Sequence, residues 1–468
     1  MMRRKIAPPV NLRTLLACAL LLALPTASAP ARPRALQTGA PEPRREQLLN
    51  GLPILLTYRP GDPQVLLKLR VQSGAAFDLA GKEGLMTLLS DILFPDPNTR
   101  EFVAEELGGR LEVATDYDHI DVTLAGRAAE FERLAELLRN AVVNTRIVAE
   151  DLARLRAERS KAASAAALAP AAVADRVVAA RLYGAHPYGR LVAGTPESLA
   201  HIERADLLLA RDRFLTADNA RLVVIGGVEP ARALRVFRQF LGAWRKSETL
   251  VPATFRRPDA PNARTLVVDQ AGADSAEVRL AVRGLARTER DQLAAEVLAA
   301  LARNRWQTAL GSVQPDNLSV RHEAHALAGL WQMSARVRPA NVAQTLEAAR
   351  TTLNALVTTP PTTAELEQAR RAAAAIVNPD KQPDVALADR WLDAESYGPT
   401  NEQRSLDELT PADIQRVAAR LFRDASVASV AVGPLSELRA QLARTASGVE
   451  VFGAPAPAMP SPSPARRP

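Results

Sequence analysis

The chain has 468 residues, 47% of them hydrophobic, which is enough for two domains with buried cores. Its formal net charge is +7, and four of the basic residues lie among the first 31. Without that segment, 55 basic residues face 52 acidic ones, or +3, which gives no electrostatic basis for a nucleic-acid partner. The only cysteine is Cys18, so the sequence after it offers no disulfide, thiolate ligand or thiol nucleophile.

The N-terminus has the pattern of a secretory signal peptide. Basic residues precede an apolar run at 15–24, and small residues follow at 27–31. The run is too short to anchor the chain in a membrane, and no later run reaches spanning length. We therefore expect residues 1–31 to be removed and the protein to be exported to the periplasm or the medium. A polar lead-in at 32–46 is expected to be flexible.

Strand-like and helix-like segments alternate after the lead-in. The predicted strands lie at residues 53–57, 65–71, 110–116, 119–124 and 221–226. The predicted helices lie at residues 84–94, 128–142, 151–168 and a segment ending at 214, with Thr195 as an N-cap before Pro196. This order predicts an α+β unit over residues 47–250, with a mainly antiparallel sheet and helices packed on one face.

The same pattern returns in the second half of the sequence. Residues 202–226 match residues 409–433 at a constant offset of 207, and residues 65–71 resemble 276–282. We therefore predict two homologous α/β-roll units, the second at 266–445, joined by a proline- and arginine-bearing linker at 251–265. Thr362 and Glu365 form a predicted capping box. The proline-rich tail at 446–468 is expected to be disordered.

The helix at 84–94 has one apolar stripe and one polar side. The stripe consists of Leu85, Leu88, Leu89, Ile92 and Leu93. The polar side carries Thr87, Ser90 and Asp91. Together with Gly81-Lys-Glu-Gly84 before it and Phe94 after it, this stretch resembles the signature helix of the insulinase/pitrilysin metallopeptidases, which carries H-x-x-E-H. The two histidines of that motif fall on Thr87 and Asp91, and the glutamate falls on Ser90.

The resemblance covers residues 46–445 and includes two further stretches. These are Leu182-Tyr-Gly-Ala-His-Pro-Tyr-Gly-Arg190 and Gly194-Thr-Pro-Glu-Ser-Leu199. It implies that the two units form half of a clamshell. In the family four such units, in one long chain or two associated chains, build the working chamber.

The resemblance also implies that the remaining chemical positions are altered. The family's third ligand, a glutamate, falls on Ala162, with Glu158 one turn earlier. The arginine and tyrosine of the second unit fall on Gly311 and Leu318, which cannot donate from a side chain. Arg305 lies nearby, where a surface role is expected.

These substitutions remove the groups that zinc hydrolysis requires. A threonine is a poor zinc ligand, one carboxylate does not hold a tetrahedral ion, and Ser90 cannot act as the base. We expect no catalytic residues, no metal ligands and no cofactor.

Other histidines give no better site. His322 and His325 fall in a region predicted as strands, where alternation places their rings on opposite faces; on a helix they would lie one turn apart. His119 begins a strand and His186 precedes a proline in a loop, so structural roles are expected. No G-x-S-x-G or phosphate-loop motif is present.

Three functional hypotheses follow. The first is an exported, non-catalytic homologue that acts as the inactive partner subunit of a zinc peptidase, contributing to peptide binding and chamber assembly. The second is an active zinc peptidase that uses Asp91 with atypical ligands. The third is a stand-alone peptide-binding or assembly module. Zinc content separates the second from the others, and a co-purifying H-x-x-E-H subunit separates the first from the third.

Overall fold

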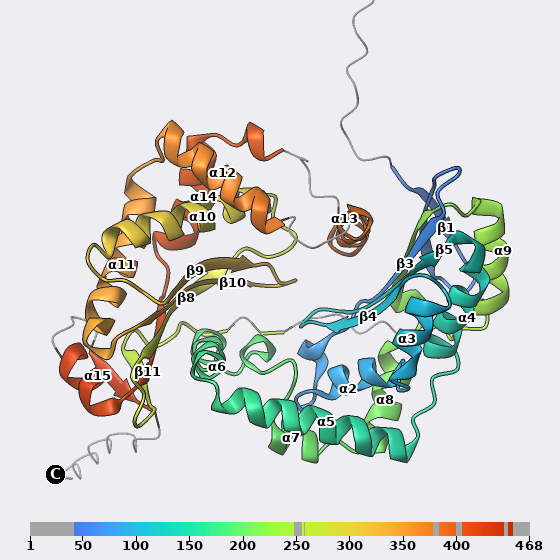
Figure 1. Cartoon of the computed structure of the whole chain (residues 1–468), viewed down its shortest axis with the longest axis horizontal. Helices are drawn as coiled ribbons and strands as arrows, with labels where there is room; N and C mark the ends of the chain where they lie inside the picture. Colours follow the sequence, from blue (N-terminus) through green and yellow to red (C-terminus); the bar gives the residue numbers. More distant parts are fainter. Residues whose placement is uncertain are drawn as a thin grey trace, which may run out of the picture. The chain divides into compact units, whose positions relative to one another are not determined.

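The structure is a computed structural model that describes residues 42–247, 255–256, 258–377, 383–398, 405–443 and 448–452. The predicted signal peptide, most of the lead-in and most of the tail lie outside the described residues. The described residues fall in one compact unit. They contain two six-stranded sheets with helices, one sheet in each half of the chain, as Figure 1 shows.

The first sheet has the strand order β1-β2-β6-β3-β5-β4. Its strands are β1 (Arg44–Gln47), β2 (Pro53–Tyr58), β3 (Gln64–Val71), β4 (Arg110–Thr115), β5 (Ile120–Arg127) and β6 (Ala220–Gly226). Only β2 and β6 pair in parallel among these strands. The predicted mainly antiparallel sheet is therefore confirmed.

The second sheet has the order β12-β7-β11-β8-β10-β9, and five of its strands repeat the first sheet. Its strands are β7 (Thr265–Asp269), β8 (Ala276–Gly284), β9 (Asn317–Glu323), β10 (Gly329–Val337), β11 (Ala428–Gly433) and β12 (Val449–Val451). The edge strands differ, because β12 pairs in parallel with β7 whereas β1 pairs antiparallel with β2. In the first sheet Leu69 pairs with Leu222, and at the same place in the second sheet Leu280 pairs with Ser429. Leu222 and Ser429 differ by 207, so the sequence repeat aligns equivalent register positions.

Most helices pack on one face of each sheet. In the first half these are α2 (Leu85–Ile92), α3 (Asn98–Glu105), α4 (Phe131–Val142), α5 (Ala149–Leu168), α7 (Pro196–Ala200), α8 (Arg204–Phe214) and α9 (Pro230–Leu241). In the second half they are α10 (Gln292–Ala309), α11 (Val342–Thr358), α12 (Thr363–Val377), α14 (Pro411–Phe422) and α15 (Leu435–Leu442). The N-cap predicted at Thr195 and the capping box predicted at Thr362 with Glu365 are both formed.

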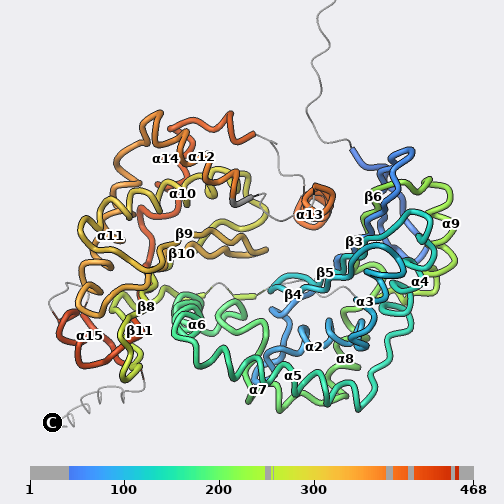
Figure 2. The backbone as a smooth tube through the Cα atoms, viewed as in Figure 1, coloured from blue at the N-terminus to red at the C-terminus, as the bar shows by residue number. Residues whose placement is uncertain are grey.

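Two further helices cover the opposite faces, and each packs on the sheet of the other half. These are α6 (Pro170–Tyr183) and α13 (Pro383–Tyr397). Val178 of α6 lies in one apolar cluster with Val430 of the second sheet, and Trp391 of α13 lies in another with Val223 of the first sheet. Figure 2 follows α6 and α13 along the chain. The sequence predicted helices on one face only, and these two exchanged helices add a second covered face.

Two edge strands lie in ranges that were predicted to be a flexible lead-in and a disordered tail. β1 begins inside the predicted lead-in and pairs with β2, and β12 lies inside the predicted tail and pairs with β7. Both assignments are corrected at these residues. β1 is short and polar, and β12 has only three residues, so neither is long enough and apolar enough for its sequence pattern to mark it as a strand.

Within the described residues, no single helix combines the length and apolarity of a membrane span. One bent pair, α5 with α6 at 93°, meets these criteria only when its two helices are taken together.

Because α13 packs on the sheet of the other half of the chain, we predict that Trp391→Ala strongly destabilises the fold. Trp391 is 8% exposed and packs against the first sheet. Removing its side chain is expected to lower the free energy of unfolding by about 3–5 kcal/mol, measured by urea denaturation. The control is Leu209→Ala at a 61% exposed position, where we expect less than about 0.5 kcal/mol. Equal costs for the two variants would show that α13 does not hold to this sheet in solution.

Candidate functional site

The start of α2 is fixed by a buried carboxylate. Asp78 accepts hydrogen bonds from the backbone N–H groups of Gly84 at 2.7 Å and Met86 at 2.8 Å. Burial raises the pKa of Asp78 to about 7. Gly84 has φ 94°, and a Cβ there would lie 2.9 Å from the carbonyl oxygen of Ala193. This glycine is therefore required both by its backbone conformation and by the close approach of the segment before α7.

The hydroxyl groups at the first two motif positions are buried and already bonded. Thr87 Oγ1 donates to the carbonyl oxygen of Val192 at 2.6 Å, and Ser90 Oγ donates to the carbonyl oxygen of Thr87 at 2.7 Å. These bonds tie α2 to the segment before α7 and to its own preceding turn. Both hydroxyl groups therefore donate to backbone carbonyls of the chain.

Asp91, at the third motif position, forms a bidentate ion pair with Arg159 of α5. Arg159 Nε lies 2.7 Å from Oδ2 of Asp91, and Nη2 lies 2.6 Å from Oδ1. The hydrogen bonds to this carboxylate raise the pKa of the Arg159 guanidinium. The two paired N–H donors match the carboxylate geometry, so the contact fixes α2 against α5. Sequence reasoning missed Arg159, although it lies three residues before the aligned position Ala162.

The other candidate ligands on α5 do not reach α2. Ala162 is exposed, and its methyl side chain has no atom that can bind a metal ion. Glu158 pairs with Arg154 of the same helix at 3.1 Å. Among the residues that the structure describes, no three His, Cys, Asp or Glu side chains are grouped so that they could hold a metal ion. The residues present therefore do not fit a tetrahedral zinc site, and a guanidinium occupies the side of Asp91 that a second ligand would need.

The two positions of the second half on which the family's arginine and tyrosine fall are occupied by residues with structural roles. Gly311 follows α10 with φ 59°, and Leu318 on β9 is buried in the core. Arg305 donates to both carboxylate oxygens of Glu365 at 2.8 and 3.1 Å, which lowers the pKa of Glu365 to about 2. Arg305 thus joins α10 to the start of α12, a defined contact in place of the expected surface role.

The histidine pair lies in two different environments. His322 Nε2 accepts a hydrogen bond from the backbone N–H of Leu285 at 3.0 Å, and its ring lies 6.2 Å from Trp331. The His325 ring instead lies 5.0 Å from Tyr188, and burial lowers its pKa to about 3. His186 Nδ1 accepts from the backbone N–H of Tyr188 at 3.2 Å, a turn-forming contact.

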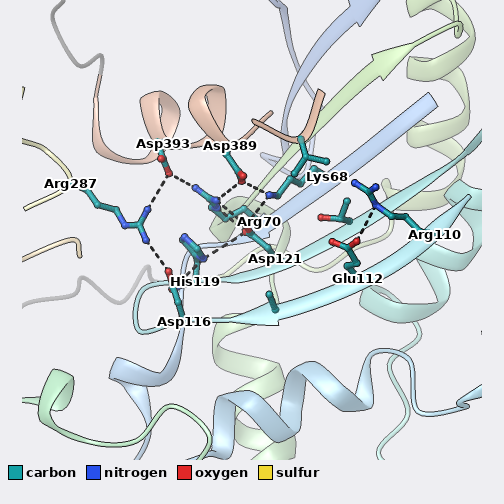
Figure 3. A pocket seen from close by; sticks show the side chains of 13 residues that line it. Lys68, Arg70, Arg110, Glu112, Asp116, His119, Asp121, Arg287, Asp389 and Asp393 are labelled. Carbon is teal, nitrogen blue, oxygen red and sulfur yellow. Dashed lines mark hydrogen bonds and ion pairs between the residues drawn. The ribbon is translucent and has the colours of Figure 1, made fainter. Parts of the chain in front are cut away.

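A hollow of about 410 Å³, here called the charged pocket, lies beside α13 on the first sheet (Figure 3). Its lining residues are Lys68, Arg70, Arg110, Glu112, Ala114, Asp116, His119, Asp121, Thr123, Arg287, Val385, Asp389 and Asp393. Sequence reasoning missed this site. The available signal was the presence of two cations, Lys68 and Arg70, inside an otherwise apolar strand.

Ion pairs connect the walls of the charged pocket. Arg70 donates to both oxygens of Asp121 at 2.8 Å and also pairs with Asp393 of α13. Lys68 pairs with Asp389 of α13. α13 is therefore held on the first sheet by ion pairs as well as by its apolar side chains.

Comparisons with known proteins agree with this geometry. The family model "Peptidase M16 inactive domain" matches residues 201–373. The chain is a homologue of the M16 peptidases, the insulinase/pitrilysin family. The family that the sequence resembles is thereby confirmed. A search of curated proteins finds no sequence match.

Solved structures share the fold at low sequence identity. The peptidase M16 inactive domain from Pseudomonas fluorescens has a TM-score of 0.74 and 18% identity, covering 84% of this chain and 98% of that one. A protease from Helicobacter pylori has a TM-score of 0.75 and 17% identity, with coverage of 84% and 100%. A chain of complex III2 from Candida albicans, with Inz-5 bound, has a TM-score of 0.69 and 13% identity, with coverage of 84% and 97%.

The Asp91–Arg159 contact predicts a measurable coupling energy. In a double-mutant cycle with Asp91→Asn and Arg159→Gln, we expect a coupling of about 1 kcal/mol in the free energy of unfolding, since the pair is bidentate and partly buried. The matched control is the exposed pair Arg154–Glu158 on the same helix, where a smaller coupling is expected. Additive effects of the two α2–α5 substitutions would contradict the role given to this pair.

Proposed function

We propose that this M16 homologue is an exported, non-catalytic subunit that pairs with a zinc-binding family member and contributes to peptide binding and chamber assembly. One observation carries the non-catalytic part of the proposal. At the three motif positions, Thr87, Ser90 and Asp91, the polar side-chain groups are engaged within the chain itself. Hydrolysis by zinc needs ligands and a base that are free to meet the metal and the water.

The preserved scaffold supports a partner role. Five strands keep the same order in both sheets and both sheets are covered on two faces, so the folding units are intact without the motif chemistry. The matched family model describes an inactive domain, and a chain of similar fold occurs within complex III2 of Candida albicans. A non-catalytic chain of this fold inside a larger assembly is therefore physically reasonable.

The second hypothesis, an active peptidase built on Asp91, is disfavoured by charge. A zinc ion beside Asp91 would have to displace the Arg159 guanidinium or lie close to it, and like charges at such distances repel. The stand-alone module differs from the partner subunit only in the absence of a second chain.

Zinc content tests the non-catalytic proposal directly. The native chain is expected to bind less than about 0.1 zinc per chain and to cleave no peptide alone, since zinc needs three protein ligands or more. The triple variant Thr87→His, Ser90→Glu, Asp91→His should bind zinc weakly, because Arg159 loses its partner and stays beside the new ligands.

Adding Arg159→Glu to the triple variant removes that cation and supplies a carboxylate, so zinc affinity should rise by about tenfold or more. The control adds Arg154→Glu on the exposed side of α5 instead. Zinc titration against a competing chelator measures the difference. A native zinc-to-chain ratio near one would sink the proposal.

Association is tested by co-expression with an H-x-x-E-H family member from the neighbouring gene. The two chains should elute together in size-exclusion chromatography, through an interface on the order of 1,200–2,000 Å². Peptide cleavage by the active chain should increase when this chain is present. The N-terminus of the exported protein should begin near residue 30 or 32. Separate elution with unchanged cleavage would favour the stand-alone module.

A further inference from the structure

The segment between β9 and β10, residues 324–328, joins the second half of the chain to the first and is called the junction loop here. The backbone N–H of Ala326 donates to Oδ2 of Asp118 at 2.8 Å. The backbone N–H of Leu327 donates to the hydroxyl oxygen of Tyr188 at 3.3 Å. That hydroxyl in turn donates to Oδ1 of Asp118 at 2.6 Å. Side chains of the first half therefore hold backbone groups of the second.

The junction loop contains one buried residue, His325. It is 7% exposed, and its ring lies 5.0 Å from the ring of Tyr188 and 5.1 Å from the ring of Tyr117. Its carbonyl oxygen accepts a hydrogen bond from the backbone N–H of Arg287 at 2.8 Å. Among the described residues, Nδ1 of the ring has no hydrogen-bond partner. A proton on Nδ1 therefore finds no acceptor in the closed loop.

The acids near this ring are already engaged by groups of the chain. The titratable groups on the surrounding segments are Asp116, Tyr117, Asp118 and His119 before β5, His186 and Tyr188 after α6, Arg287 after β8, Arg321, His322 and Glu323 on β9, and Asp393 and Tyr397 on α13. Arg287 pairs with Asp116 and Asp393, as Figure 3 shows. Glu323 pairs with Arg321 at 3.1 Å, and Asp118 accepts the two hydrogen bonds described above.

A positive charge on this ring is unfavourable while the junction loop is closed. Burial lowers the pKa of His325 to about 3, and the cation Arg287 acts in the same direction, as do the more weakly acting His322, His119 and Arg321. A histidine in water has a pKa of about 6.5. Between these two values, the ring is neutral in the closed loop and protonated once it reaches water.

We propose that the junction loop is an acid-sensitive contact between the two halves, closed around a neutral His325 at neutral pH and opened by acidification. The closed loop binds the proton less readily than the open one, so a fall in pH favours opening. The effect begins near pH 6.5 and continues to about pH 3, the pKa values of the ring in the open and closed loop. The proposal goes beyond the suggested partner role and does not rest on it.

Two neighbouring groups titrate in opposite directions. Burial raises the pKa of Asp116 to about 6, so the closed state takes up that proton more readily than an exposed carboxyl does. Burial lowers the pKa of His119, 3.2 Å away, to about 4, so this ring acts in the same direction as His325. The contributions of Asp116 and His119 therefore largely cancel on acidification, and a variant of His325 isolates its own contribution.

Hydrogen exchange of the full chain tests the proposal at about pH 7.5 and about pH 5, with the exchange rate of each peptide segment divided by its intrinsic rate at that pH. In the native chain, the opening constant of residues 324–328 is expected to rise about thirtyfold on acidification, because only the open loop is protonated at pH 5. The buried strand β6 is the internal reference. An equal rise there means that the whole fold opens, and the local contact is then wrong.

The variant His325→Phe keeps an aromatic ring against Tyr117 and Tyr188 and removes the proton site. Its opening constant is expected to rise less than about threefold over the same pH range. His325→Gln repeats the test with a smaller neutral side chain. The control is His201→Asn at an exposed position after α7, where the native rise is expected. Equal native opening constants at the two pH values would overturn the proposal, as would a thirtyfold rise that persists in both His325 variants.

Discussion

The central strands of both sheets are apolar on both faces, and neither half can satisfy this constraint alone. In β6, Leu222 and Val224 belong to the core under the helices of the first half, whereas Val223 and Ile225 point to the opposite face. Leaving that second face in water would forfeit roughly 25 cal/mol for each Å² of apolar surface. The cover comes from α13 of the other half, and α6 provides the same cover for β11.

This exchange explains why charges occur in the most buried strands. Lys68 of β3 meets Asp389 of α13, and Arg279 of β8 meets Asp175 of α6 at 2.6 Å. A buried cation is costly unless it is paired, so positions of α13 and α6 that leave Lys68 or Arg279 without its carboxylate are disfavoured. The apolar contacts supply the stabilisation, and these charges supply the orientation.

Much of the fold can be predicted from local patterns, because the signals lie within one segment. The stripe of α2, the 207-residue offset and the cap at Thr195 each need only nearby residues. The exchanged helices could not be predicted in this way, since α13 meets partners more than 300 residues earlier in the sequence. Arg159 was missed for a related reason: an ungapped alignment led to Ala162, and only the packing of α5 on α2 shows which side chain meets Asp91.

The α2 region shows how the fold persists without motif chemistry. A polar helix face that lost its partners would leave buried hydroxyls and a carboxylate unsatisfied, each at a cost of about 1–3 kcal/mol. Here Thr87 and Ser90 bond to backbone carbonyls, and Asp91 bonds to Arg159. The ion pair joins α2 to α5, helices that a shared metal would otherwise have to link. The contacts of α2 thus hold this part of the first unit together with groups of the chain itself.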